Sequence, residues 1–220
     1  MQKHSPLQLI LFIFLLGFLL AFVQLGLLSI AFEKLGLSAG TGFFILFMSL
    51  FGSAINIPLF SLQSEMPPAP LPPTLWQLFP LMRPAVGGKT IVAVNVGGCL
   101  IPLAFSLYLA ISQAINPLHA VLGIIMVSAI CYLFSRPIAG LGIGMPMLVA
   151  PISAALSATL LDPPHSAALA YIIGTLGVIV GADLLRLKDI RRMGTAIASI
   201  GGAGTFDGIF ITGIVAILLA

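Results

Sequence analysis

Four long stretches of the chain carry no charged residue, and this feature limits the possible folds more than any other. The stretches are Pro6–Phe32, Leu35–Ser64, Thr90–Ser135 and Pro137–Leu161. Each exceeds the roughly 20 apolar residues that a helix needs to cross about 30 Å of hydrocarbon. Only 7% of the residues are charged, whereas soluble domains average about 25%. The pattern predicts a multi-pass membrane protein.

We expect one all-α membrane domain over residues 1–220, a polytopic bundle of about seven transmembrane helices. Asn116-Pro117 divides the third uncharged stretch, because a residue before proline disfavours the helical conformation. A proline-rich loop, 64–89, separates the second expected helix from the third. The expected helices are 6–32, 35–63, 90–113, 117–135, 137–161, 165–185 and 194–220.

The basic residues are distributed unevenly between the two sides of this arrangement. Eight of the nine lie at the N-terminus or in alternate loops, and Lys34 alone lies on the other side. Because Lys and Arg are retained on the cytoplasmic side, the N-terminus is predicted to be cytoplasmic and the C-terminus outside. The eight are Lys3, Arg83, Lys89, Arg136, Arg186, Lys188, Arg191 and Arg192.

The net charge of +3 follows these loops, so it indicates a lipid bilayer as partner and not nucleic acid. Cys99 and Cys131 each lie alone in an apolar run, which indicates neither a disulfide framework nor a metal site. No phosphate-binding loop or zinc spacing occurs, and no cofactor is expected. The oligomeric state is left open.

Two asparagines lie at expected membrane depth. Asn56 and Asn95 are each followed by a proline, and Gly97-Gly98 weakens the second helix further. An asparagine at such a kink can bond the backbone groups that the kink leaves free. The alternative is that both asparagines line a polar cavity.

Two aspartates in the last third of the chain are the main candidates for chemistry. Asp183 lies near the cytoplasmic end of helix 165–185, three residues before Arg186, with which it could pair. Asp207 follows a glycine-rich segment, and a helix that starts near Thr205 would hold it in its first turn as a capping acid.

Taken together, the acids suggest a catalytic pair. If the connection between the last two helices forms a hairpin, Asp183 and Asp207 arrive at similar depth and could share a proton. Such a pair can activate water and protonate a leaving amine. The glycines around the acids would let a substrate backbone and water approach; they are Gly181, Gly201, Gly202 and Gly204.

The chain from about Leu35 resembles an uncharacterised family of prokaryotic membrane proteins. The matching elements are INIP (Ile55–Pro58), VAVNVGG (Val92–Gly98), RPIAGLGIGMP (Arg136–Pro146), GTLGVIVGADLLRL (Gly174–Leu187) and ASIGGAGTFDGIF (Ala198–Phe210). This resemblance implies a multi-pass protein of a prokaryotic inner (cytoplasmic) membrane, and it implies no activity.

The layout of the acids is similar to that of the GxGD intramembrane aspartyl proteases, the presenilin, signal peptide peptidase and prepilin peptidase types. This resemblance implies one catalytic aspartate on each of two successive helices, here Asp183 and Asp207. GAGTFD departs from GxGD by two inserted residues, Ala182 replaces the tyrosine that presenilins have before the first acid, and no PAL element follows.

Three hypotheses therefore stand. The first is an aspartic-type intramembrane peptidase that cleaves membrane-embedded or leader peptides. The second is a small proton- or cation-coupled transporter or channel that uses the same acids. The third is a non-catalytic membrane subunit or scaffold in which the acids only cap and pair.

Overall fold

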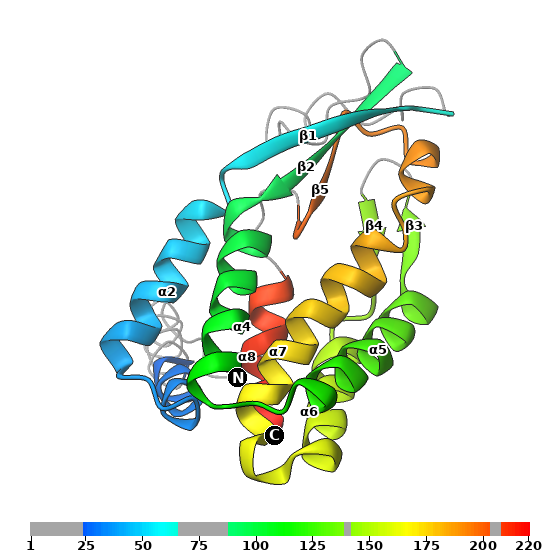
Figure 1. The fold of residues 1–220 in the computed structure, drawn as a ribbon. Coiled ribbons are helices and arrows are strands. Elements are labelled where there is room, and N and C mark those ends of the chain that lie inside the picture. Colours follow the sequence, from blue (N-terminus) through cyan, green and yellow to red (C-terminus); the bar gives the residue numbers. More distant parts are fainter. Residues whose placement is uncertain (1–23, 66–87, 139–141, 203–207) are drawn as a thin grey trace, which may run out of the picture.

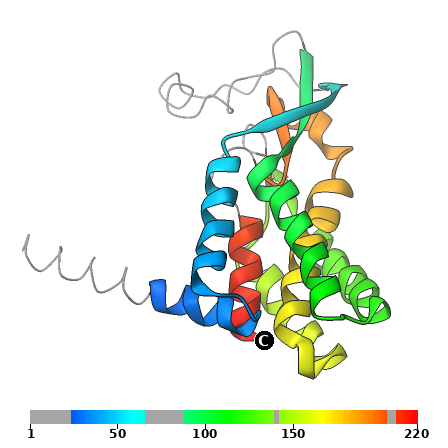
Figure 2. The ribbon, with the colours of Figure 1, turned by 60° about the vertical axis from the view of Figure 1, so that its left-hand side comes forward.

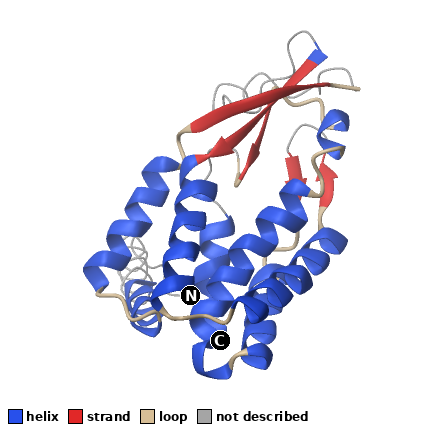
Figure 3. Ribbon diagram, in the orientation of Figure 1, coloured by secondary structure: helices blue, strands red, loops and turns tan. Residues whose placement is uncertain are grey.

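A group of packed helices carries a small β-sheet at one end (Figure 1). The computed structural model describes residues 24–65, 88–138, 142–202 and 208–220. Within them the chain is mostly helical, and strands are present as well (Figure 3). The α-helices after the helix Gln24–Lys34 are α2 (Ala39–Gly52), α4 (Ile101–Ser112), α5 (Pro117–Phe134), α6 (Val149–Leu161), α7 (Ser166–Val178) and α8 (Gly208–Leu219).

Helix α7 is the centre of the bundle, because α4, α5, α6 and α8 all pack against it. Small residues allow these close approaches. A side chain at Gly177 would meet Val127 of α5, and one at Gly213 of α8 would meet the ring of Tyr171. Close helix packing through small residues is typical of membrane bundles, where lipid gives no hydrophobic drive for association.

Two short π-helices interrupt or extend the α-helices. The π-helix η3 (Val96–Leu100) precedes α4, and η5 (Ile179–Leu184) continues α7. π-Helical turns of this kind occur frequently at functional sites. Two 3₁₀ turns, η4 (Pro163–His165) and η6 (Asp189–Arg192), lie on either side of α7 in the chain.

A three-stranded sheet, in the order β1-β2-β5, covers one end of the bundle (Figures 1 and 2). Strands β1 (Asn56–Gln63) and β2 (Lys89–Asn95) pair antiparallel, whereas β5 (Ile197–Ile200) pairs parallel to β2. A second sheet consists of the short antiparallel strands β3 (Arg136–Ile138) and β4 (Gly142–Gly144). Every strand lies in a segment that the apolar runs predict as helix or loop.

The all-α expectation is therefore wrong in four places. The last eight residues of 35–63 are β1, the start of 90–113 is β2, the start of 137–161 is β3 and β4, and part of 194–220 is β5. In each case a ladder of hydrogen bonds to a partner strand satisfies the backbone. Hydropathy does not distinguish such a segment from a helix. Helix α5, by contrast, begins and ends within one residue of the expected 117–135.

Two helical segments in the described part of the chain are long and apolar enough to cross a membrane, Pro117–Phe134 and Pro163–Leu184. A third crossing is counted if Gln24–Lys34 and Ala39–Gly52, which meet at a bend of 108°, are taken as one broken span. The structure thus gives two to three candidate spans where seven are expected. Residues 1–23 and most of the proline-rich loop, 66–87, lie outside the described residues.

Candidate functional site

Asp183 lies in η5, at the sheet end of the long segment that α7 begins. Its side chain is half-buried. The carboxylate oxygen Oδ2 accepts a hydrogen bond of 2.8 Å from the backbone N–H of Gly201. Because Gly201 directly follows β5, this bond joins the end of the central helix to the edge of the three-stranded sheet.

The chain on each side of Asp183 is held against α5. Gly181 lies so close to the backbone of Ser128 that a methyl group there would overlap the Ser128 carbonyl. On the other side, Arg186 donates to the Ser135 carbonyl at 2.8 Å and to the Tyr132 carbonyl at 2.7 Å. Asp183 is therefore positioned by anchors two residues before it and three residues after it.

Among the described residues, Asp183 does not form the ion pair with Arg186 that the spacing allows. Arg186 Nη1 bonds Asp189 Oδ2 at 3.1 Å, and its guanidinium lies 4.1 Å from the centroid of the Tyr132 ring. The carbonyls at the C-terminal end of α5 attract the guanidinium, because a helix end exposes unpaired acceptors.

Gly201 is a glycine for two reasons. Its φ of +84° lies in the left-handed region, which favours glycine. A Cβ atom there would also lie 2.7 Å from Cys99 Cβ and from the backbone carbon of Gly98. The next residue, Gly202, has a φ of +95°. The turn after β5 thus packs directly on η3 while its N–H reaches Asp183.

Asn56 and Asn95 lie opposite each other in the β1-β2 ladder, and their side chains bond (Asn95 Nδ2 to Asn56 Oδ1, 3.1 Å). Asn95 is fully buried; it also donates to the Ser53 carbonyl at 2.7 Å and accepts from the Gly98 N–H at 2.7 Å. Asn56 Oδ1 accepts a second bond, of 2.6 Å, from Ser199 Oγ of β5.

The structure thus brings together several predicted site residues and leaves others undescribed. Asp183 meets Gly201, Gly201 packs on η3, and Asn95 caps η3, so these residues form one cluster with Asn56. Gly204, Thr205 and Asp207 lie outside the described residues. In the chain, Asp207 directly precedes Gly208, the first residue of α8.

Ser199 is the member of this cluster that sequence reasoning missed. Its hydroxyl reaches Asn56 because β5 pairs with β2, and no short-range pattern around Ser199 indicates that pairing. The placement of Arg186 is likewise beyond short-range reasoning, since the carbonyls of Ser135 and Tyr132 that hold it are 51 and 54 residues away in the chain.

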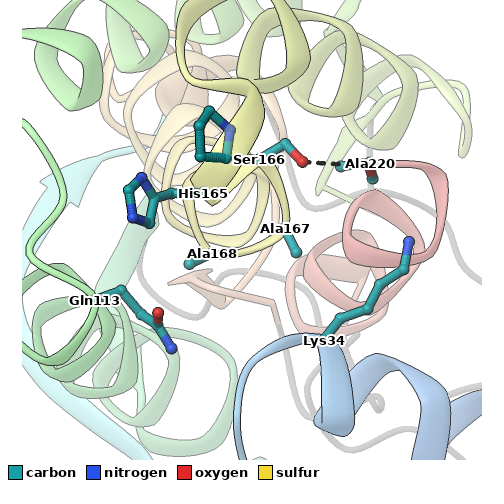
Figure 4. Close-up of a pocket in the computed structure, with 8 residues that line it drawn as sticks. Lys34, Gln113, His165, Ser166, Ala167, Ala168 and Ala220 are labelled. Atoms are coloured by element: carbon teal, nitrogen blue, oxygen red, sulfur yellow. Dashed lines mark hydrogen bonds between the residues drawn. The ribbon is translucent and has the colours of Figure 1, made fainter.

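A hollow of about 190 Å³ lies at the opposite end of α7, away from Asp183 (Figure 4). Lys34, Gln113, His165 and Ser166 are among the residues that line it. Lys34 Nζ donates to the Ile217 carbonyl at 3.2 Å, and Ser166 Oγ to the Ala220 carbonyl at 3.3 Å. These bonds hold the end of α8 in place, and the hollow shares no residue with the Asp183 cluster.

A family model described as "Protein of unknown function (DUF1614)" matches residues 50–219. The chain belongs to the DUF1614 family. The expected resemblance to an uncharacterised family is thereby confirmed, and the matched range includes both aspartates and both asparagines. No curated protein and no solved structure matches the chain.

Proposed function

We propose that this DUF1614 protein is an intramembrane aspartyl protease, in which Asp183 and Asp207 form the catalytic pair. The observation that carries the proposal is the hydrogen bond between Asp183 and Gly201. This bond fixes the first acid beside the start of the glycine-rich segment that leads, six residues later, to the second acid.

The packing of the last two helices supports the pairing. Helices α7 and α8 run in opposite directions (Figure 1), and Gly174 of α7 lies beside Thr212 and Ala216 of α8. Asp183 comes nine residues after Gly174, in the π-helix η5 that continues α7. In the sequence, Asp207 directly precedes Gly208, the first residue of α8. The first acid thus follows α7 and the second precedes α8, and the antiparallel packing of these two helices supports the pairing.

The proposed chemistry is peptide hydrolysis by two carboxyl groups. One carboxylate takes a proton from water as the water oxygen attacks the peptide carbonyl carbon. The other carboxyl group gives its proton to the nitrogen as the C–N bond breaks, so an acid and an amine leave. The Gly201 N–H would orient the Asp183 carboxylate for this exchange, as a backbone donor holds a fixed direction.

We further propose that the sheet end faces the cytoplasm of a prokaryotic cell. In Figure 1 the labelled strands lie toward one end of the helices, and the bend between Gln24–Lys34 and α2 lies at the other. Basic residues of the described part, Lys89, Arg136, Arg191 and Arg192 among them, belong to the sheet-end elements, whereas Lys34 belongs to the other end. Cytoplasmic retention of basic residues supports this orientation.

A cleavage assay tests the proposal. Purified full-length protein in detergent micelles is incubated with a panel of synthetic transmembrane and leader peptides, and mass spectrometry identifies new termini. Asp183→Asn and Asp207→Asn should each lower the cleavage rate by roughly 100-fold or more, because each removes one acid–base group. Glu65→Gln is the matched control, since the Glu65 side chain is 54% exposed and its ion pair with Arg192 is 3.5 Å long.

Unchanged cleavage in either aspartate variant would overturn the proposal. So would a complete absence of cleavage across the panel together with a proton or cation flux, in proteoliposomes, that depends on Asp207. We favour the protease over the transporter, because Asn95 is fully buried and its side chain bonds Ser53, Asn56 and the Gly98 N–H, so it does not line a path.

A further inference from the structure

The proposed acid pair needs Gly201 to stay in one place, and the structure shows what holds it there. Gly201 lies between two supports. Ser199, two residues earlier, is bonded to Asn56 of β1. On its other side, Gly201 packs against Gly98 and Cys99 of η3.

Both supports depend on the pair of asparagines. The bond from Ser199 to Asn56 passes across the central strand, because β2 lies between β1 and β5. Ala93 of β2 is the register partner of Ser199, and its small side chain leaves room for this bridge. Asn56 Oδ1, on β1, thus accepts hydrogen bonds from both Asn95 of β2 and Ser199 of β5, and the second bond joins the two outer strands.

Asn95 supplies the second support. It is the N-cap of η3, and its Oδ1 accepts the Gly98 N–H while its Nδ2 bonds Ser53 at the end of α2. A capping side chain fixes the first turn of a helix by pairing backbone donors that have no partner inside the helix. The surface of η3 that meets Gly201 is therefore set by Asn95.

We propose that Asn56, Asn95 and Ser199 are positioning residues that hold the Gly201 N–H at the Asp183 carboxylate. They act through Gly201 and touch no reacting atom. The inference rests on the proposed function for its catalytic meaning, but the placement of the Gly201 amide is a property of the folded chain and is measurable without any substrate.

Amide hydrogen exchange of the full chain in detergent micelles is the direct test. Ser199→Ala should raise the exchange rate of the Gly201 amide by about tenfold, the effect of losing one ordinary hydrogen bond. Ser199→Thr keeps the hydroxyl and should exchange as the wild type does. Asp183→Ala gives the exchange rate of the Gly201 amide when no carboxylate accepts it. Ser61→Ala is the control, because Ser61 lies on β1 outside the cluster.

Cleavage kinetics give the second readout. Ser199→Ala should lower kcat by about tenfold with KM within about twofold, because it disturbs the acid and not the binding of peptide. Ser199→Thr should restore kcat. Asn56→Ala should act more strongly than Ser199→Ala, and if it does not fold, the serine variants alone carry the test.

The outcomes separate this inference from the proposed function. Equal Gly201 exchange in the wild type, Ser199→Ala and Asn56→Ala overturns the positioning role, even if both aspartate variants abolish cleavage. Raised exchange in the serine variant upholds it, even if the wild type cleaves no peptide and the protease proposal fails. If the protein cleaves peptide, and Ser199→Ala raises the exchange of the Gly201 amide without lowering kcat, then the position of this amide does not matter for catalysis and that part of the inference is contradicted.

Discussion

The Oδ2 atom of Asp183 accepts the N–H of Gly201 at 2.8 Å, although the two residues lie 18 positions apart. Between them the chain leaves the central helix, turns through η6 and enters the sheet as β5. The bond thus closes a loop whose two ends carry the residues that the sequence singles out. It also places Asp183 where the helix bundle meets the sheet, because the bond joins η5 to the turn after β5.

The fit of Gly201 against η3 predicts a large cost for any side chain there. Gly201→Ala should lower the free energy of unfolding by about 3 kcal/mol or more, because left-handed backbone strain adds to a clash with Cys99. Gly88→Ala separates the two effects, since Gly88 has a φ of +70° but nothing within 4 Å of its would-be Cβ. It should cost about 1 kcal/mol.

Chemical denaturation in detergent, followed by circular dichroism, measures both values. An equal loss of stability in Gly201→Ala and Gly88→Ala would show that the contact with η3 contributes nothing.

The burial of Asn95 predicts a second contrast between matched variants. Asn95→Ala removes the cap of η3 and leaves the Gly98 N–H and the Ser53 carbonyl without their partner. We expect a loss of about 3 kcal/mol in the free energy of unfolding, since buried polar groups left unpaired cost about 1–3 kcal/mol each. Asn116→Ala removes the same kind of cap from the exposed start of α5 and should cost about 1 kcal/mol.

Thermal unfolding of the two variants in the same detergent checks this difference. A smaller loss for Asn95→Ala than for Asn116→Ala would contradict the assignment of Asn95 to the structural cluster.

The sequence predicts a mostly helical chain, which the structure shows, but neither the number of spans nor the sheet. Helix α5 has signals at both ends that short-range rules recognise, namely the cap Asn116 with Pro117 at its start and Pro137 shortly after its C-cap, Ser135. Strand β2 lies in a run that is as apolar as a helix. Its sequence KTIVAVN, rich in β-branched residues, was a usable signal for a strand.

The glycines near β4 carried a similar signal. Gly142 and Gly144 are two residues apart, and a repeat of two is the period of a strand. No short-range signal predicts the pairing of β5 with β2, because it joins residues about 100 positions apart in the chain. For this reason the Ser199–Asn56 bond, and with it the support of Gly201, was out of reach of sequence reasoning, whereas Asp183 and Gly201 themselves were not.

Arg186 should not tolerate lysine. Its guanidinium bonds the carbonyls of Tyr132 and Ser135 at the end of α5, and it lies over the Tyr132 ring. It also bonds the Ser135 hydroxyl and the Asp189 carboxylate. An ammonium group cannot reproduce this planar set of donors. Arg186→Lys should therefore lower the free energy of unfolding by about 2 kcal/mol.

Arg192→Lys is the matched control, because the Arg192 side chain is 71% exposed and bonds only Glu65 among the ion pairs of the described residues. Its effect should stay within about 0.5 kcal/mol. Equal effects of the two substitutions, measured by chemical denaturation, would show that the clamp on α5 is not specific to arginine.

We expect Asp162 to make the stability of the fold depend on pH in the acidic range. It lies between α6 and η4, and its oxygens contact His165 Nδ1 at 3.1 Å and His119 Nδ1 at 3.5 Å. Burial by itself would raise the pKa of the Asp162 carboxyl, but the hydrogen bonds and charges of His165 and His119 outweigh it and hold the pKa below its usual value. A lowered pKa in the folded state means that the ionised form stabilises the fold.

This stabilisation is fully present above the unfolded-state pKa of about 4 and is lost as pH falls through the folded-state pKa. The Tm of the wild type should therefore exceed that of Asp162→Asn at neutral pH, and the gap should close in acid. Thermal unfolding of both proteins from neutral pH down to acid measures the gap. A difference that stays constant over this range would mean that the carboxylate charge at Asp162 contributes nothing and that only the shape of the side chain matters.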